Sequence, residues 1–169
     1  MQFDEIEPFL RYYKRIRERT VRVIGSIPHD KLEWTPVAGK FTFGDIIRHL
    51  TAIERYMFVE NALQRPSRYP GHSKELADGY ENVLSYFNHL HTESLKLLVH
   101  LSPEALQQKC VTPAGISITV WKWLRAMVEH EIHHRGQLYV YLSSLGITGP
   151  PLYGLTSEEV KSKSLPGKM

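Results

Sequence analysis

Four long segments of the sequence repeat apolar residues with the period of an amphipathic α-helix, and none sustains the alternation of a strand. In the first segment, for example, Phe9, Tyr13 and Ile16 are separated by steps of four and three residues, which places them on one face. The pattern predicts an all-α chain folded as a four-helix bundle. The predicted helices span about 4–26, 42–64, 74–101 and 117–145, and Asp78-Gly79 is a candidate break in the third.

Long, proline-containing connections separate the first helix from the second and the third helix from the fourth. The first connection contains Pro28 and Pro36, and the other contains Pro103 and Pro113. A serine followed by proline is a common helix start, so we expect a short extra helical turn at Ser102. The sequence therefore predicts two helical hairpins with long linkers.

The composition is that of an average globular protein. Of the 169 residues, 42% are hydrophobic and 23% are charged. We expect one bundle domain over 1–152 and a polar C-terminal tail over 153–169. No apolar run approaches the roughly 20 residues that span a bilayer, and the acidic start does not resemble a signal peptide. With Cys110 as its single cysteine, the chain has no intrachain disulfide, so we expect a cytoplasmic protein.

The basic residues do not form the clustered stripe of a nucleic-acid-binding face. The chain has 21 basic and 18 acidic residues, for a net charge of +3. The densest basic group, Lys14, Arg15, Arg17 and Arg19, is interrupted by Glu18 and is predicted to lie on the solvated side of the first helix. We therefore expect no nucleic-acid partner and no membrane partner.

Histidine is the unusual residue of the chain, with nine copies. His130 and His134 are four residues apart, so both rings leave one face of the fourth helix, and His49 lies on the predicted core face of the second. Three imidazoles can hold a divalent metal and leave a coordination position open, as catalytic sites do. The alternative is three separate core histidines, each with its own hydrogen-bond partner, because chance often supplies this spacing in a histidine-rich chain.

Three polar residues lie near the predicted histidine cluster. Gln137 and Tyr141 continue the face that carries His134, and Asp45 precedes His49 by one turn. Each has two possible roles. Gln137 and Tyr141 could orient a substrate or make ordinary core hydrogen bonds. Asp45 could fix a ligating imidazole or cap the second helix.

Two segments resemble a known family. His130 to Gln137 reads H-E-I-H-H-R-G-Q, which resembles the H-x-x-x-H-R-G-Q signature of the DinB-like (YfiT-like) superfamily. The stretches 32–36 and 42–50 resemble the first half of the same family, and the resemblance spans about 6–149. It implies a four-helix bundle with a divalent metal, most often nickel or zinc, on the positions of His49, His130 and His134. It also implies a homodimer.

The resemblance further implies a reaction class. Characterised relatives include transferases and isomerases that use low-molecular-weight thiols such as bacillithiol or mycothiol, so we expect a metal-dependent thiol S-transferase acting on a small molecule. The alternatives are a hydrolase in which water takes the open position and a non-catalytic, stress-related metal-binding scaffold. Cys110 lies in a linker, so the thiol would come from a cosubstrate. Arg48, Arg55 and Arg125 are candidates for binding it, unless they lie on solvated helix faces.

Overall fold

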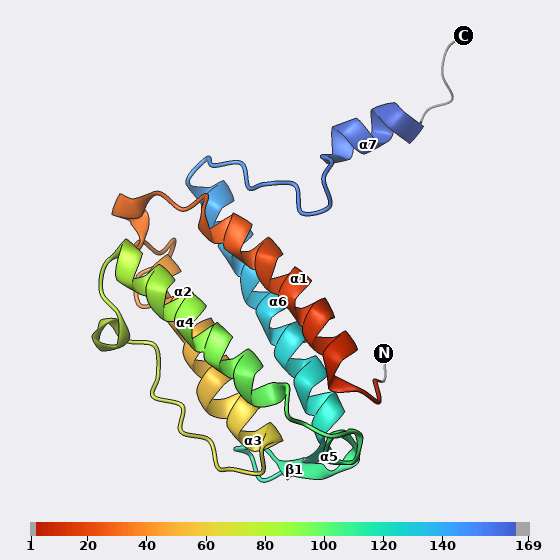
Figure 1. Cartoon of the computed structure of the whole chain (residues 1–169). Helices are drawn as coiled ribbons and strands as arrows, with labels where there is room; N and C mark the ends of the chain where they lie inside the picture. The colour runs from red at the N-terminus through yellow and green to blue at the C-terminus, as the bar shows by residue number, and fades with distance from the viewer. Residues whose placement is uncertain (1–2, 165–169) are drawn as a thin grey trace.

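Four long helices build the bundle, as the sequence predicts (Figure 1). The structure is a computed structural model and describes residues 3–164. A turn of π-helix, η2, continues the second long helix and leads into a last α-helical turn, α3. The helical segments are α1 (Ile6–Ile24), α2 (Phe43–Ile53), η2 (Glu54–Val59), α3 (Glu60–Ala62), α4 (Tyr80–Leu98) and α6 (Val120–Ser144).

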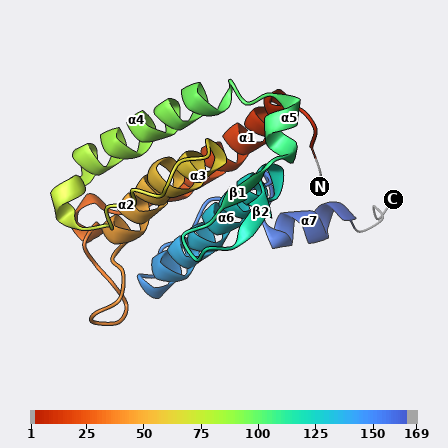
Figure 2. The ribbon, with the colours of Figure 1, turned by 90° about the horizontal axis from the view of Figure 1, so that it is seen from below.

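The helices do not alternate in direction along the chain. In Figure 1, α1 and α6 run one way, and α2 and α4 run the other way. The connection 63–79 therefore returns along the length of the bundle. Helix α2 packs on both α4 and α6, and α1 packs on α6. Figure 2 shows α4 and α6 on opposite sides of the bundle.

Two boundaries differ from the sequence prediction. The third long helix begins at Tyr80 and not near Lys74, because Gly79 has a φ of +82° and residues Lys74–Leu76 form a separate 3-10 turn, η3. The fourth begins at Val120. The residues before it, Ser117–Thr119, form strand β2, which pairs antiparallel with β1, Lys109–Val111. Strands of three residues are too short to give a detectable alternation.

Two smaller α-helices and the 3-10 turn η1, His29–Lys31, complete the described chain. The turn predicted after Ser102 is α5, Pro103–Gln107, and the Ser102 side chain caps it. Within the predicted tail, Ser157–Ser164 form the exposed helix α7, while 165–169 lie outside the described residues. Across residues 3–164, no helix combines the length and the apolar character needed to cross a membrane.

The core consists of two apolar clusters with a polar layer between them. One cluster includes Phe9, Phe58 and Met127, and the other includes Val23 and Leu138. Each long helix carries polar residues at the height where the clusters separate, and the ones that matter below are Arg17, His49, Glu54, His91, His130, Glu131 and His134. The bundle thus brings histidines and charged residues together at mid-height.

Candidate metal centre

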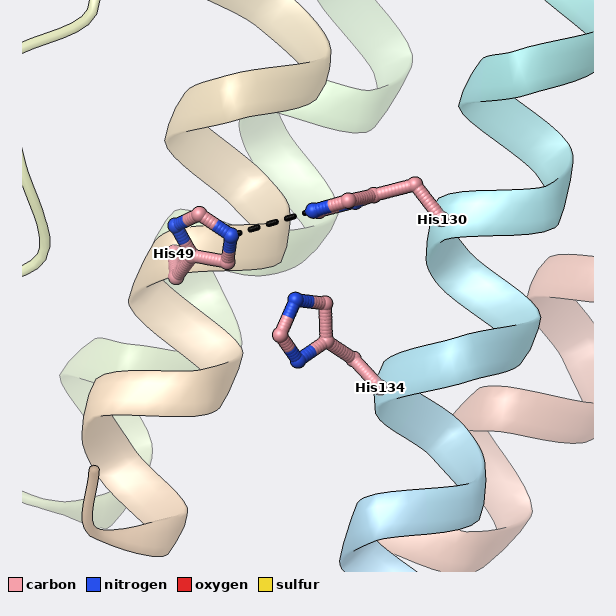
Figure 3. Close-up of side chains that lie close together, drawn as sticks. All are labelled: His49, His130 and His134. Carbon is pink, nitrogen blue, oxygen red and sulfur yellow. Dashed lines mark hydrogen bonds between the residues drawn. The ribbon is translucent and has the colours of Figure 1, made fainter. Parts of the chain in front are cut away.

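Three histidine rings converge between α2 and α6 (Figure 3). His49 projects from α2, and His130 and His134 project from successive turns of α6. The Nε2 atoms of His49 and His130 are 3.1 Å apart. One nitrogen from each ring lies within 4.8 Å of the other two. The structure therefore brings together the three residues that the sequence analysis selected as metal ligands.

The geometry of this cluster fits a shared divalent ion. Nitrogens bound to one metal at about 2.0–2.1 Å lie roughly 2.9–3.4 Å from each other at tetrahedral or octahedral angles. The His49 to His130 separation falls in that range. If both of these nitrogens present lone pairs, a cation between them removes their mutual repulsion. Imidazole donors suit zinc, nickel, copper and iron.

The rings are also in the protonation state that binds metals. Burial, followed by the neighbouring histidines, lowers the pKa of His49 to about 3 and that of His130 to about 4. Burial also lowers the pKa of His134, although its hydrogen bond to Gln137 opposes this. Neutral imidazole is the ligating form, so the three rings are ready to bind at neutral pH.

A chain of hydrogen bonds fixes the tautomer of His134. The Phe41 carbonyl can only accept, so the Tyr141 hydroxyl donates to it at 3.0 Å. The Gln137 Nε2 group then donates to the Tyr141 oxygen at 3.1 Å. This leaves the Gln137 Oε1 atom to accept from His134 Nδ1 at 2.9 Å. The proton of His134 is therefore on Nδ1, and its Nε2 lone pair is free for a metal.

Tyr69 holds His49 and was not found by the sequence analysis. Its hydroxyl lies 2.6 Å from His49 Nδ1 and can accept a hydrogen bond from the Nδ1–H group, which leaves the Nε2 lone pair free to face His130. Tyr69 belongs to the connection 63–79, where helical periodicity carries no information. Arg48 Nε holds the same connection by donating to the His72 carbonyl at 2.9 Å.

A cleft opens over the His134 side of the cluster. Its volume is about 480 Å³. It is lined by Gly39, Lys40 and Phe41 from the α1–α2 connection and by His133, His134, Gln137 and Tyr141 from α6. All three rings of the cluster are half-buried, because they lie at the edge of the buried helix faces. Sequence periodicity had placed them on the core faces of these helices, and the structure leaves each of the three partly exposed.

Asp45 takes the capping role and not the imidazole-positioning role. Its carboxylate accepts from the Thr42 backbone N–H, and its own backbone N–H donates to the Thr42 hydroxyl. The pair forms a capping box at the start of α2. The other carboxylate oxygen accepts from Arg48 at 2.8 Å. Burial alone would raise the pKa of Asp45, but these hydrogen bonds hold it below its ordinary value.

The three arginines considered for substrate binding all form ion pairs within the protein. Arg48 is fully buried and pairs with Glu33 and Asp45, and Arg55 is buried against Glu60 and Glu93. Both predictions for these residues, substrate binding and a solvated helix face, are therefore wrong, because ion pairs balance the buried charges. Arg125 is exposed and pairs with Glu129 one turn further along α6.

Cys110 is not part of the candidate metal centre. It lies on β1 with its side chain fully buried in the apolar cluster around Phe9 and Met127. Burial raises the pKa of its thiol. The residue is therefore an inert component of the core.

A second polar cluster lies directly beside the histidines. Arg17 of α1 pairs with Glu54 of η2 and with Glu131 of α6, and all three are almost completely buried. His91 of α4 contacts the other oxygen of Glu54 at 2.9 Å, and the Thr20 hydroxyl donates to Glu131 at 2.7 Å. The sequence analysis had placed Arg17 on the solvated face of α1, which is wrong.

Fold and site together define a four-helix bundle with a candidate three-histidine metal centre. The family model of the DinB superfamily matches residues 12–138, and the chain belongs to this superfamily. Two Bacillus subtilis (strain 168) proteins of uncharacterized function are similar in sequence. YrdA is 24% identical over 162 residues, covering 93% of each chain, and YjoA is 26% identical over 140 residues, covering 81% of this chain and 88% of YjoA.

Two solved structures share the fold. A DinB-like protein from Bacillus cereus ATCC 10987 aligns with a TM-score of 0.71 at 18% identity, covering 89% of this chain and 99% of that one. The DinB-like protein YjoA from Bacillus subtilis aligns with a TM-score of 0.71 at 19% identity, covering 87% of this chain and 98% of that one. At these identities the likeness concerns the fold.

Proposed function

We propose that this protein is a metal-dependent enzyme that activates a low-molecular-weight thiol for transfer to a small electrophilic substrate. The observation that carries the proposal is the convergence of His49, His130 and His134 beside an open cleft. Three protein ligands and an accessible side are typical of catalytic metal sites, whereas structural sites are closed by four. Zinc or nickel is the ion we expect.

The protein residues hold the ion and leave room for the reactants. A divalent ion at this place would lower the pKa of a thiol or of water and so supply a nucleophile at neutral pH. Tyr69 and the Gln137–Tyr141 pair keep the imidazole lone pairs directed at the cluster. In the transfer, the thiol S–H proton passes to solvent and a carbon–sulfur bond forms. The leaving group departs with the electrons of the bond that breaks.

A hydrolase is the second candidate, because the same three imidazoles would activate water. In that reaction, water replaces the thiol in the cleft of about 480 Å³. The third candidate is a non-catalytic metal-binding scaffold. The half-buried rings and the open cleft favour a reactive site over this scaffold, since a structural ion needs no access to small molecules. A cytoplasmic location and a homodimer stay predictions of the sequence analysis.

Elemental analysis followed by a thiol screen tests the proposal. The purified protein is first assayed for bound zinc and nickel, and the loaded protein is then mixed with thiols and a chromogenic electrophile. We expect conjugation that needs both thiol and metal and that is lost after chelation. Turnover of ester or amide substrates without any thiol would replace the transferase with the hydrolase. A loaded protein that catalyses neither reaction would support the scaffold.

A further inference from the structure

The cleft over the candidate metal centre has one charged side chain in its lining, that of Lys40. The lining contains no carboxylate. Lys40 follows Gly39, whose φ of +77° belongs to the turn that carries this rim of the cleft. The turn is closed by a hydrogen bond from the Lys40 backbone to the Val37 carbonyl at 3.1 Å. A lysine therefore lies at the rim of the space through which small molecules would reach His134.

The ammonium group of Lys40 is not neutralised by the protein. Among residues 3–164 its side chain has no ion pair and no hydrogen bond, whereas Lys31 and Lys74 each lie near a carboxylate. The two carboxylates closest to Lys40 in the sequence, those of Glu33 and Asp45, are both paired with Arg48. The positive charge at the rim is thus available to a ligand.

The metal centre adds to this positive charge. Its proposed ligands are imidazoles, which bind metals in their neutral form. A divalent ion held by three neutral ligands keeps both of its charges, unlike an ion held by aspartate or glutamate. The cleft would then combine a divalent cation with an ammonium group and no compensating anion, which attracts anionic ligands.

We propose that this cleft selects a thiol that also carries a carboxylate, and that Lys40 supplies the selecting charge. The inference rests on the proposed function and narrows its cosubstrate to an anionic class. The sulfur would face the three histidines while the carboxylate pairs with Lys40 at the rim. Lys40 is then a specificity-determining residue and has no part in holding the ion.

Three small thiols of similar size and different charge provide the test. The cobalt-loaded protein is titrated with 3-mercaptopropionate, 3-mercaptopropanamide and cysteamine, and the sulfur-to-cobalt charge-transfer band gives each apparent Kd. We expect the carboxylate to bind roughly fivefold to tenfold more tightly than its amide, the effect of one partly desolvated ion pair. Raising the salt concentration should reduce that preference.

Substitutions at Lys40 identify the residue responsible. The change Lys40→Gln should abolish the preference for the carboxylate, and Lys40→Glu should turn it into a preference for cysteamine. Both variants should bind cobalt as the parent protein does. The matched control is Lys96→Glu, an equal charge reversal at an exposed lysine of α4 that does not line the cleft, and it should leave the preference unchanged.

The outcomes separate this inference from the proposed function. If all three thiols give the band with equal Kd, or if Lys40→Glu leaves the order unchanged, the anionic selectivity is overturned while thiol activation stands. If no thiol perturbs cobalt that is bound to the three histidines, thiol activation is overturned, and the selectivity inferred here is overturned with it.

Discussion

The polar layer of the bundle contains two clusters, which differ in their exposure to solvent and in the charge of their side chains. The ion cluster of Arg17, Glu54 and Glu131 is closed to solvent, and Arg17 forms an ion pair with each of the two carboxylates. The histidine cluster of His49 and its two partners on α6 is half-buried and contains nothing that compensates a bound cation. The two clusters include neighbouring residues of the sequence, because Glu131 directly follows His130.

The difference indicates what each cluster does. A buried set of ion-paired charges holds helices in one arrangement and is closed to a ligand. A half-exposed set of imidazole donors can take up an ion from solvent. We therefore expect changes in the ion cluster to alter folding and changes in the histidine cluster to alter metal binding.

The largest effect is expected from Arg17→Met. This change leaves Glu54 and Glu131 buried without their cation, which costs about 3–5 kcal/mol in the free energy of unfolding. Urea denaturation monitored by circular dichroism measures it. The matched control is Arg15→Met, at an exposed position of α1, which should change stability by less than about 0.5 kcal/mol. Equal effects of the two changes would show that the ion cluster does not stabilise the bundle.

Metal removal should have the next largest effect. An ion that binds only the folded state stabilises it by about 2.7 kcal/mol at a free concentration of 100 Kd, so a chelator should lower the Tm. The two apolar clusters form without the site, so the chelated protein should keep its helical circular dichroism at room temperature. A chelated protein that is unfolded at room temperature would make the metal structural.

Tyr69→Phe should weaken metal binding without unfolding the protein. Loss of a hydrogen bond to a ligating imidazole typically reduces metal affinity about 10- to 100-fold. Competition with a chromogenic chelator measures the Kd. Tyr12→Phe is the control, since Tyr12 is an exposed tyrosine of α1. Equal affinities in the parent and Tyr69→Phe proteins would remove Tyr69 from the site.

Acid should affect the two clusters in different pH ranges. Burial holds the pKa of His49 at about 3 and that of His130 at about 4, below the ordinary value of 6.5, so the unfolded chain takes up protons first. The metal-free protein should therefore lose stability as the pH falls below 6.5, by less than about 1.4 kcal/mol per pH unit for each half-exposed ring.

The ion cluster should respond only at lower pH. Burial alone would raise the pKa of Glu54, but Arg17 and then His91 hold this pKa below its ordinary value of 4.5. The contribution of Glu54 to the free energy of unfolding is therefore lost as the pH falls through the lowered pKa. The variant His49→Phe should flatten the loss between pH 6.5 and 4.5, as measured by urea denaturation with chelator present. An unchanged slope would contradict the assignment of that loss to the histidines.

Helical periodicity predicted the bundle and placed the three histidines on core faces, and the resemblance to the DinB-like superfamily then selected them as one metal site. The spacing of His130 and His134 is local, and the apolar stripes locate the face that carries them. Tyr69 and Lys40 could not be found this way, because each lies in a connection whose path depends on the whole fold. Arg17 was misplaced because a charged residue on a helix is usually solvated, and only Glu54 and Glu131 from other helices make its burial possible.

Metal content in two histidine variants tests the central claim most directly. His134→Ala removes one ring of the histidine cluster, whereas His91→Ala removes the ring that contacts Glu54 in the ion cluster. Both proteins are loaded with zinc or nickel, passed through a desalting column and assayed by elemental analysis. We predict that His134→Ala loses stoichiometric metal and that His91→Ala retains it. Equal metal content in the two variants would contradict the assignment of His49, His130 and His134 as the metal centre.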